Sequence, residues 1–207
     1  MIIKDYSVSQ EEFTLVYDSL LELYRTNPVP DELSKYYESE AYISHTDSRK
    51  TLFDRLYQWV KSYNLKHKIA LIKQYKKENI HLLDIGAGTG DFVLSSKKYA
   101  HWEAMGIEPS EKARAKAEEK GLLLQADFGN LLPHSFDVIT MWHVLEHVPD
   151  VTQEIQIISK LLKKDGIAVI AVPNYRSWDA QHYKEHWAAY DVPRHLWHFS
   201  KKSIEQL

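Results

Sequence analysis

A glycine-rich turn between a predicted strand and a predicted helix constrains this chain more than any other feature. Residues 81–92, HLLDIGAGTGDF, run from an apolar strand into a turn with Gly86, Gly88 and Gly90, and then into a helix. Glycine adopts positive φ at no steric cost and lets a ligand approach the main chain closely. The turn also leaves free N–H groups at the start of a helix, where anionic groups are stabilised. We therefore expect a ligand site at the end of this strand.

The distribution of glycine predicts how the chain is organised. All seven glycines lie between positions 86 and 166, and the first 85 residues contain none. A stretch without glycine indicates helices joined by turns of other residues. Apolar residues at helical spacing predict helices over 11–25 and from 48 toward 75, with a short helix over 31–37 between them. The sequence therefore predicts an N-terminal helical extension over 1–78.

From residue 80 the pattern changes to short apolar runs that alternate with amphipathic stretches, which is typical of a parallel sheet with crossover helices. Strands are expected at 80–85, 102–107, 121–125, 136–141 and 166–172. Helices are expected at 90–99, 110–119 and 151–163. We therefore predict an α/β core over 79–174, with helices on both faces of a mostly parallel sheet. An aromatic and histidine-rich segment follows over 175–207, and it ends within a starting helix.

The composition excludes several classes of protein. Hydrophobic residues make up 44% of the chain and charged residues 27%, with a net charge of -3, as in ordinary globular proteins. The absence of cysteine excludes disulfides, thiolate zinc sites, iron–sulfur clusters and cysteine nucleophiles, and it favours a cytoplasmic location. The longest uncharged apolar stretch, 167–173, is far shorter than the roughly 20 residues that span a bilayer. We therefore expect neither a membrane span nor secretion.

The residues around the turn discriminate between two classes of ligand. Dinucleotide sites carry G-x-G-x-x-G, but the third glycine position here holds Asp91, whose carboxylate would repel a pyrophosphate. Asp84, two residues before the first glycine, favours a ligand with a cationic group. S-adenosylmethionine fits, because it combines a carboxylate, an ammonium and a sulfonium. The alternative is a glycine turn that only joins strand to helix.

Acidic residues also follow the next two predicted strands. Glu108 lies eighteen residues after Gly90, and a carboxylate there can accept hydrogen bonds from both ribose hydroxyls. The alternative is a charge at a helix N-terminus, with Ser110 as a plain N-cap. Asp127 can accept from an adenine amino group and Phe128 can line the ring, whereas a solvated loop aspartate would look the same.

Four segments in this order resemble the class I S-adenosylmethionine-dependent methyltransferases, in the branch similar to ubiquinone-biosynthesis O-methyltransferases. They are LDIGAGTG at 83–90, GIEPS at 106–110, AD at 126–127 and FDVITMWHVLEHVPD at 136–150. The resemblance implies a Rossmann-like seven-stranded sheet whose last pair is antiparallel. Only five of those strands are expected here, so strands six and seven would be missing. It also implies S-adenosylmethionine as cofactor and S-adenosylhomocysteine as product.

The expected cofactor-binding residues lie at the ends of four strands. They are Asp84, Gly86, Ala87, Gly88, Gly90, Glu108, Pro109, Asp127, Phe128, Trp142 and His143. Residues 188–200 also resemble a segment of the same branch, in which it lies over the acceptor side. We therefore expect the segment 175–207 to contribute to binding of the methyl acceptor.

The string His143-Val144-Leu145-Glu146-His147 matches the H-x-x-E-H motif of an inverted zinc protease. That motif needs a continuous helix, whereas here a strand runs into it and Pro149 follows closely, so we exclude the protease. Some quinone O-methyltransferases of the resembled branch bind a divalent ion at the positions of His143, Glu146 and His147. We expect no metal: Glu146 and His147 fix the loop beneath the cofactor, while Trp142 and His143 contact it.

Methyl transfer is an in-line displacement at a sulfonium, so the protein mainly positions the two reactants, a contribution of about 7–11 kcal/mol. A base is needed only if the acceptor arrives protonated, and histidine suits a phenol or similar hydroxyl. His147 is the first candidate and His195 the second. The alternative is that the tail histidines and aromatic residues only pack a small lid.

The predicted function is S-adenosylmethionine-dependent O-methylation of a small-molecule acceptor or an isoprenoid- or glycan-linked one. Two alternatives stay open: a cofactor-binding module without turnover, and an RNA or protein methyltransferase. No segment matches a specific nucleic-acid module. Nine Lys or Arg between Arg49 and Lys77 face only Asp54 as a clear acid, a pattern that favours a solvated helix face. The alternative for this run is peripheral contact with an anionic surface. The sequence predicts no oligomeric state.

Overall fold

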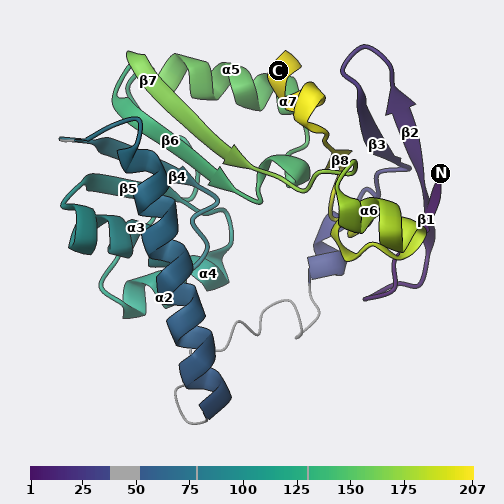
Figure 1. Ribbon diagram of the computed structural model, residues 1–207, viewed down its shortest axis with the longest axis horizontal. Coiled ribbons are helices and arrows are strands. Elements are labelled where there is room, and N and C mark those ends of the chain that lie inside the picture. The colour runs from purple at the N-terminus through teal and green to yellow at the C-terminus, as the bar shows by residue number, and fades with distance from the viewer. Residues whose placement is uncertain (38–51, 78, 130) are drawn as a thin grey trace. The chain divides into compact units, whose positions relative to one another are not determined.

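The computed structural model of the protein describes residues 1–37, 52–77, 79–129 and 131–207 (Figure 1). The chain forms two compact units. Unit 1 comprises Met1–His45, His143–Ile155 and Ala171–Leu207, and unit 2 comprises Thr46–Trp142 and Gln156–Ile170. Each unit has its own four-stranded sheet and its own apolar core.

The sheet of unit 2 has the strand order β5-β4-β6-β7. Its strands are β4 (His81–Ile85), β5 (Glu103–Ile107), β6 (Phe136–Trp142) and β7 (Leu162–Ala171). The central strand β4 pairs in parallel with β5 on one side and with β6 on the other, and Leu83 faces Met105 and Ile139. The mixed α/β architecture with a parallel sheet confirms the predicted fold class.

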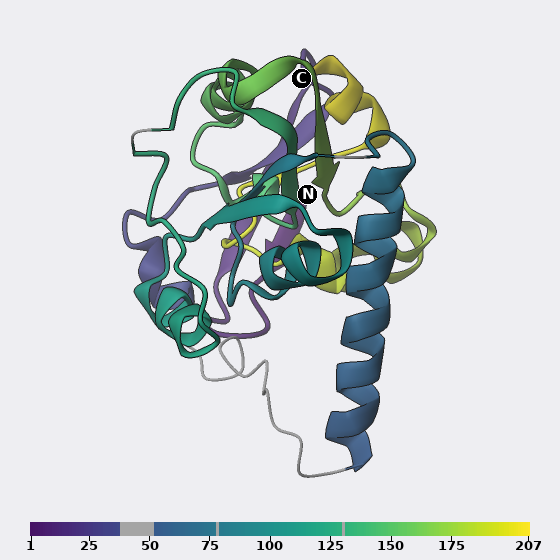
Figure 2. The same cartoon turned by 90° about the vertical axis from the view of Figure 1, so that its left-hand side faces the viewer.

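Helices connect these strands, as the alternating pattern predicts. They are α2 (Leu52–Lys73), α3 (Asp91–Ser95), the π-helix η2 (Ser96–Ala100), α4 (Glu111–Glu119) and α5 (Val151–Leu161). Figure 2 shows that α2 extends well past the strands, and its C-terminal half contributes Ile69 and Ile72 to the core of unit 2. Among the described residues, no helix has the length and apolar character needed to cross a membrane.

The core of unit 2 explains why β4 is central. Four of the five residues of β4 are buried, and Leu82 packs with Val93, Trp102 and Val138. Full burial of each large apolar side chain contributes about 1.5–3 kcal/mol. A strand covered on both faces therefore reads in the sequence as a continuous apolar run, and the single charge in it, Asp84, stands out.

One predicted strand of this core, at 121–125, does not form a ladder of paired residues. Among the described residues it contributes one parallel bridge, between Ile107 and Gln125. Gly121 adopts φ 77° and Leu123 is exposed, so the chain turns where the prediction has extended backbone. The segment still follows β5, because Gln125 N–H donates to the Gly106 carbonyl.

The prediction that strands six and seven are missing needs correction. Counted along the chain, the sixth and seventh strands are β6 and β7, and both are present in the sheet of unit 2. The strand count differs because the prediction places helices over 1–78, so that its first strand is the one at residue 80. Its fourth and fifth strands, at 136–141 and 166–172, therefore correspond to β6 and β7. The structure already has three strands before residue 80.

Unit 1 contains those three strands in an antiparallel sheet of order β1-β2-β3-β8. The strands are β1 (Ile2–Lys4), β2 (Glu12–Asp18), β3 (Leu23–Asn27) and β8 (Trp197–His198). Short helices surround them: η1 (Leu33–Tyr37), η3 (Leu145–His147), α6 (Trp178–Tyr183), η4 (Lys184–His186), η5 (Ala188–Tyr190) and α7 (Lys201–Gln206). Ile3, Phe13, Leu15, Tyr36 and Val192 form the core of this unit.

The predicted helical extension over 1–78 is therefore wrong in its first part. Phe13 and Leu15 are buried and alternate with exposed Thr14 and Val16, which is the period of a half-buried strand. The turn after β2 needs no glycine, because the Asp18 carboxylate accepts hydrogen bonds from two backbone N–H groups that follow it. The predicted helix at 31–37 matches η1, and α2 forms most of the last one. Residues 38–51 lie outside the described part of the chain.

Candidate functional site

The glycine turn joins β4 to α3 and has the backbone that its sequence predicts. Gly86, Gly88 and Gly90 adopt φ of 69°, 55° and 75°. A Cβ on Gly90 would lie 2.3 Å from Leu122 Cδ2, so this glycine is also required by close packing. A Cβ on Gly88 would meet no atom within 4 Å. The turn thus packs tightly at its third glycine and is open at its second.

Glu108 at the end of β5 contacts the glycine turn directly. Its Oε2 accepts a hydrogen bond from Gly88 N at 2.7 Å, and its Oε1 accepts from Ser110 N at 2.8 Å. Ser110 is the N-cap of α4, accepting from Ala113 N, as the alternative interpretation of this segment predicts. The structure thus brings the predicted acid and the predicted turn together, and also shows the cap.

Asp84 is buried beneath this turn. Thr140 Oγ1 on β6 donates a 2.6 Å hydrogen bond to Asp84 Oδ1. Burial raises the pKa of Asp84 to about 7, although the Thr140 hydrogen bond and the nearby Lys68 ammonium both act to lower it. A cation that binds near Asp84 would favour its ionised form.

Lys68 and Thr140 are residues of this region that the sequence interpretation missed. The Lys68 ammonium on α2 lies 4.3 Å from the ring centroid of Trp142, and burial lowers its pKa while the charge of Asp84 opposes the shift. Lys68 directly precedes Ile69 on the apolar stripe of α2, which is the signal that separates it from the exposed lysines. Thr140 is the one hydroxyl within the apolar run of β6.

The remaining predicted cofactor residues have simpler surroundings. Asp127 is exposed and its Oδ1 accepts from Gly129 N at 2.8 Å, while Phe128 is half-buried. Pro109 is exposed and its carbonyl accepts from Arg114 Nη1 at 2.7 Å. The exposed position of Asp127 and its local hydrogen bond fit the alternative interpretation, a solvated loop aspartate. Its contact with adenine stays a prediction.

The basic run of α2 is partly engaged within unit 2. Lys61 pairs with Asp91 at 2.9 Å, and the Lys66 ammonium lies 5.4 Å from the ring centroid of Tyr99. Trp59 and Tyr63 are exposed on the same helix and stack with centroids 5.8 Å apart. Contact of this helix with an anionic surface stays a prediction.

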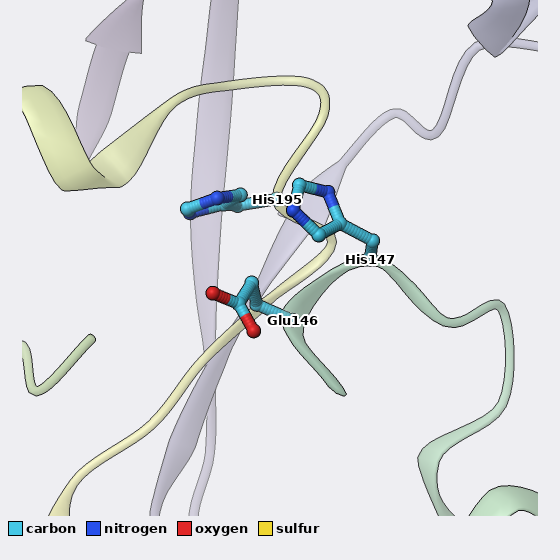
Figure 3. A group of neighbouring side chains, drawn as sticks. All are labelled: Glu146, His147 and His195. Carbon is cyan, nitrogen blue, oxygen red and sulfur yellow. The ribbon is translucent and has the colours of Figure 1, made fainter. Parts of the chain in front are cut away.

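Unit 1 holds the two histidines predicted to act on the acceptor. Glu146 and His147 lie on η3 and His195 lies in the tail, and potential ligand atoms of all three are within 4.8 Å of one another (Figure 3). The rings of His147 and His195 have centroids 4.6 Å apart. Burial and the neighbouring His147 lower the pKa of His195 to about 4, against the opposing charges of Asp191 and Glu146. His195 is therefore neutral at physiological pH.

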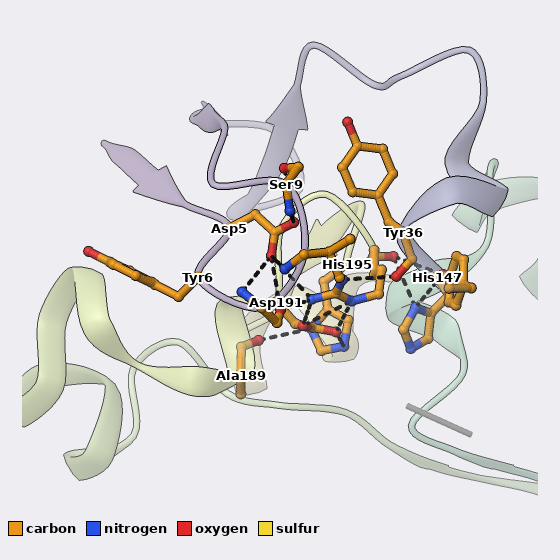
Figure 4. Close-up of polar contacts among 12 residues, drawn as sticks. Asp5, Tyr6, Ser9, Tyr36, His147, Ala189, Asp191 and His195 are labelled. Carbon is orange, nitrogen blue, oxygen red and sulfur yellow. Dashed lines mark hydrogen bonds and ion pairs between the residues drawn. The ribbon is translucent and has the colours of Figure 1, made fainter. Parts of the chain in front are cut away.

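Backbone carbonyls orient both rings. His147 Nδ1 lies 2.9 Å from the Arg194 carbonyl oxygen and 3.1 Å from Tyr37 Oη, and His195 Nδ1 lies 2.8 Å from the Ala189 carbonyl oxygen (Figure 4). Because a carbonyl only accepts, each Nδ1 carries a hydrogen, and in the neutral form of each ring Nε2 keeps its lone pair. His143 differs from these two, since its side chain is exposed and its Nδ1 lies 3.4 Å from Glu146 Oε1.

A buried arginine holds the tail segment that carries His195. Arg194 Nε donates to both carboxylate oxygens of Asp191 at 3.1 and 3.0 Å, and Nη1 donates to the Tyr36 carbonyl at 3.0 Å (Figure 4). Nη2 donates to Ser7 Oγ at 2.6 Å and lies 3.6 Å from Asp5. The sequence interpretation did not identify this arginine, because its partners come from three separate parts of the chain.

Comparison with known proteins identifies the family. A family model described as a methyltransferase domain matches residues 54–207. The chain belongs to this methyltransferase family. The match includes the glycine turn, Glu108 and η3, and thus all the residues predicted to bind the cofactor. It confirms the resemblance drawn from the sequence motifs.

Curated relatives of this methyltransferase domain include the ubiquinone biosynthesis O-methyltransferases of Pelagibacter ubique and Aeromonas salmonicida. The first is 39% identical over 107 residues, which cover 47% of this chain and 43% of the relative. The second is 34% identical over 102 residues, which cover 45% of this chain and 43% of the relative. The match thus spans less than half the length of these curated relatives.

Solved structures with the same fold include a SAM-dependent methyltransferase from Archaeoglobus fulgidus. It has a TM-score of 0.57 and 21% identity, and the match covers 77% of this chain and 72% of that one. Phosphoethanolamine N-methyltransferase 2 of Haemonchus contortus, solved in complex with S-adenosyl-L-methionine, also has a TM-score of 0.57, with 18% identity. That match covers 88% of this chain and 44% of that one. At these identities the likeness concerns the fold.

Proposed function

We propose that this methyltransferase domain binds S-adenosylmethionine at the carboxyl ends of β4 and β5 and transfers its methyl group to an oxygen of a small-molecule acceptor. The observation that carries the proposal is the 2.7 Å hydrogen bond from Gly88 N to Glu108, because it joins the open glycine turn to the acid at the end of the neighbouring strand. The ubiquinone biosynthesis O-methyltransferases among the relatives support oxygen as the receiving atom.

The charges of unit 2 suit the parts of this cofactor. Glu108 keeps acceptor capacity for ribose hydroxyls, since a carboxylate accepts about four hydrogen bonds and two are used here. Asp84 and Lys68 place a carboxyl group and an ammonium near each other beside the turn. The methionine part of the cofactor carries an ammonium and a carboxylate, so that each would meet an opposite charge.

Methyl transfer itself needs little from the protein beyond alignment. The acceptor oxygen forms a bond to the methyl carbon as the carbon–sulfur bond breaks, and the sulfur leaves with the electron pair as a neutral thioether. A hydroxyl acceptor must also lose its proton. We propose His147 as the first and His195 as the second candidate to receive that proton at Nε2, because both rings keep a lone pair there.

The test separates cofactor binding from turnover. Calorimetry with S-adenosylhomocysteine should show binding to the 207-residue chain, and Glu108→Gln should weaken it at least 10-fold. Glu111→Gln removes an exposed acid three residues further along, in the first turn of α4, and serves as the matched control. Binding of NAD in place of S-adenosylhomocysteine would overturn the proposal.

An assay with methyl-labelled S-adenosylmethionine and a panel of phenol, catechol and amine acceptors tests the second half. Transfer to the hydroxyl compounds supports O-methylation, and transfer to the amines alone contradicts it. Cofactor binding without transfer to any acceptor would favour the module without turnover.

A further inference from the structure

A fully buried carboxylate in unit 1 has no hydrogen-bond partner among the described residues. Glu146 is 0% exposed, and neither Oε1 nor Oε2 accepts a hydrogen bond from any described residue. Oε1 lies 3.4 Å from His143 Nδ1, on a side chain that is 66% exposed. An unpaired buried charge is costly, and structures retain one where a ligand or an ion completes it.

The two imidazoles beside this carboxylate are oriented as metal ligands are. Ligating histidines commonly donate the hydrogen of the second ring nitrogen to a carbonyl, which fixes the tautomer and directs the free lone pair at the ion. His147 and His195 both have Nδ1 against a backbone carbonyl, at 2.9 and 2.8 Å. Their Nε2 atoms are therefore the available donors, and ligand atoms of the two rings and of the Glu146 carboxylate lie within 4.8 Å of one another (Figure 3).

We propose that Glu146, His147 and His195 form a divalent-metal site in unit 1. Two imidazole nitrogens and one carboxylate oxygen are ligands that suit Zn²⁺ and neighbouring transition metals. Ligands about 2.1 Å from a tetrahedral ion are about 3.4 Å apart. The donor atoms lie within 4.8 Å of one another, so small side-chain rotations would bring them to that spacing. Three protein ligands leave a fourth position for water or a substrate oxygen.

The ligand set differs from the one that the motif alone suggests. The H-x-x-E-H string offers His143 as the third ligand, but its side chain is exposed, and its Nδ1 faces Glu146 Oε1 alone among the donors described. His195, 48 residues beyond His147, takes that place from a different segment. The other charged groups beside it are Asp191, whose Oδ2 lies 3.8 Å from His195 Nε2, and Arg194, which pairs with Asp191.

The proposed ion site does not depend on methyl transfer, and the two histidines have a different role when an ion is bound. A bound ion would act as a Lewis acid toward a hydroxyl oxygen, and His147 and His195 would then be ligands and not bases. A requirement of methyl transfer for the ion can thus be distinguished from a requirement for a histidine base.

The experiment titrates the metal-free 207-residue chain with Zn²⁺ and with Co²⁺. Calorimetry should give one ion per chain, and Co²⁺ should give the intense visible absorption of a low-coordinate site. Glu146→Gln and His195→Ala should each weaken binding at least 100-fold, while His143→Ala, the matched control from the same motif, should change it less than 3-fold. Binding of S-adenosylhomocysteine should be unchanged in His195→Ala, which lies outside the predicted cofactor residues, so the two proposals fail separately.

Two results would overturn the proposal. The first is the absence of Zn²⁺ and Co²⁺ binding at millimolar concentration. The second is loss of binding in His143→Ala with retention in His195→Ala, which would place the ion on the motif alone. Because Glu146→Gln conserves volume and His195→Ala does not, agreement between them, with circular dichroism unchanged, excludes unfolding as the cause.

Discussion

Ionisation of Asp84 should make the stability of this domain depend on pH in the direction opposite to most carboxylates. Burial raises the pKa of Asp84 to about 7 from 3.8 in an unfolded chain. A raised pKa means that the folded state holds the proton more tightly, so the stabilising contribution is complete below pH 3.8 and is lost as pH rises through 7. The full difference corresponds to about 4 kcal/mol, of which about 3 kcal/mol falls between pH 5 and pH 8.

Asp84→Asn isolates this contribution, because asparagine keeps an oxygen that can accept from Thr140 but does not ionise. Urea unfolding of both proteins at pH 5, 6, 7 and 8 should show the wild-type free energy of unfolding falling relative to the variant by about 3 kcal/mol. The difference between the two proteins cancels Asp91 and Asp137, whose pKa values are lowered and whose stabilisation is lost toward acid pH. A difference that stays constant over this range would refute the buried, raised state of Asp84.

Three further changes test other parts of the structure. Gly90→Ala should destabilise the domain by at least about 1 kcal/mol, since it combines left-handed backbone with a 2.3 Å contact to Leu122. Thermal unfolding of Gly90→Ala with and without Leu122→Ala would show whether relieving the contact restores part of the lost stability. Arg194→Met should cost about 3–5 kcal/mol by leaving the partly buried Asp191 without its guanidinium partner, and the double variant with Asp191→Asn should cost less. His147→Gln should lower the rate of methyl transfer at least 10-fold with unchanged affinity for S-adenosylhomocysteine. An equal loss of transfer rate and of this affinity would contradict a role confined to the acceptor side.

The sequence predicted the sheet of unit 2 because its signals are local. Strands buried on both faces read as apolar runs, and the turn after β4 needs glycine at three positions for reasons of φ and packing. Glu108 and Gly88 meet because β4 and β5 are neighbouring parallel strands, whose carboxyl ends lie at one edge of the sheet. Lys68 was missed because its charge resembles that of the exposed lysines around it, and only its register beside Ile69 distinguishes it.

The N-terminal strands escaped prediction for a different reason. In 11–25, apolar residues occur at spacings that satisfy both a helix and a strand, and Tyr17 and Tyr24 fit either. The absence of glycine favoured helix, yet Gln10 and Glu22 adopt φ of 63° and 51° without it. Pairing of β3 with β8, a strand about 170 residues later, stabilises the hairpin, and nothing local in the sequence encodes that partner.

Glu146 shows how a local conflict points to function. A buried carboxylate without a partner destabilises a fold, so its retention between two oriented imidazoles is explained by what it binds. In the presence of a metal chelator, Glu146→Gln should therefore be more stable than the wild type, by about 1–3 kcal/mol, because it removes an uncompensated buried charge. With excess Zn²⁺ the order should reverse, since an ion that binds only the folded wild type at 100 times its Kd stabilises it by about 2.7 kcal/mol. Thermal unfolding of both proteins under both conditions measures this, and a wild type that is the more stable protein in chelator would show that Glu146 serves the fold and not an ion.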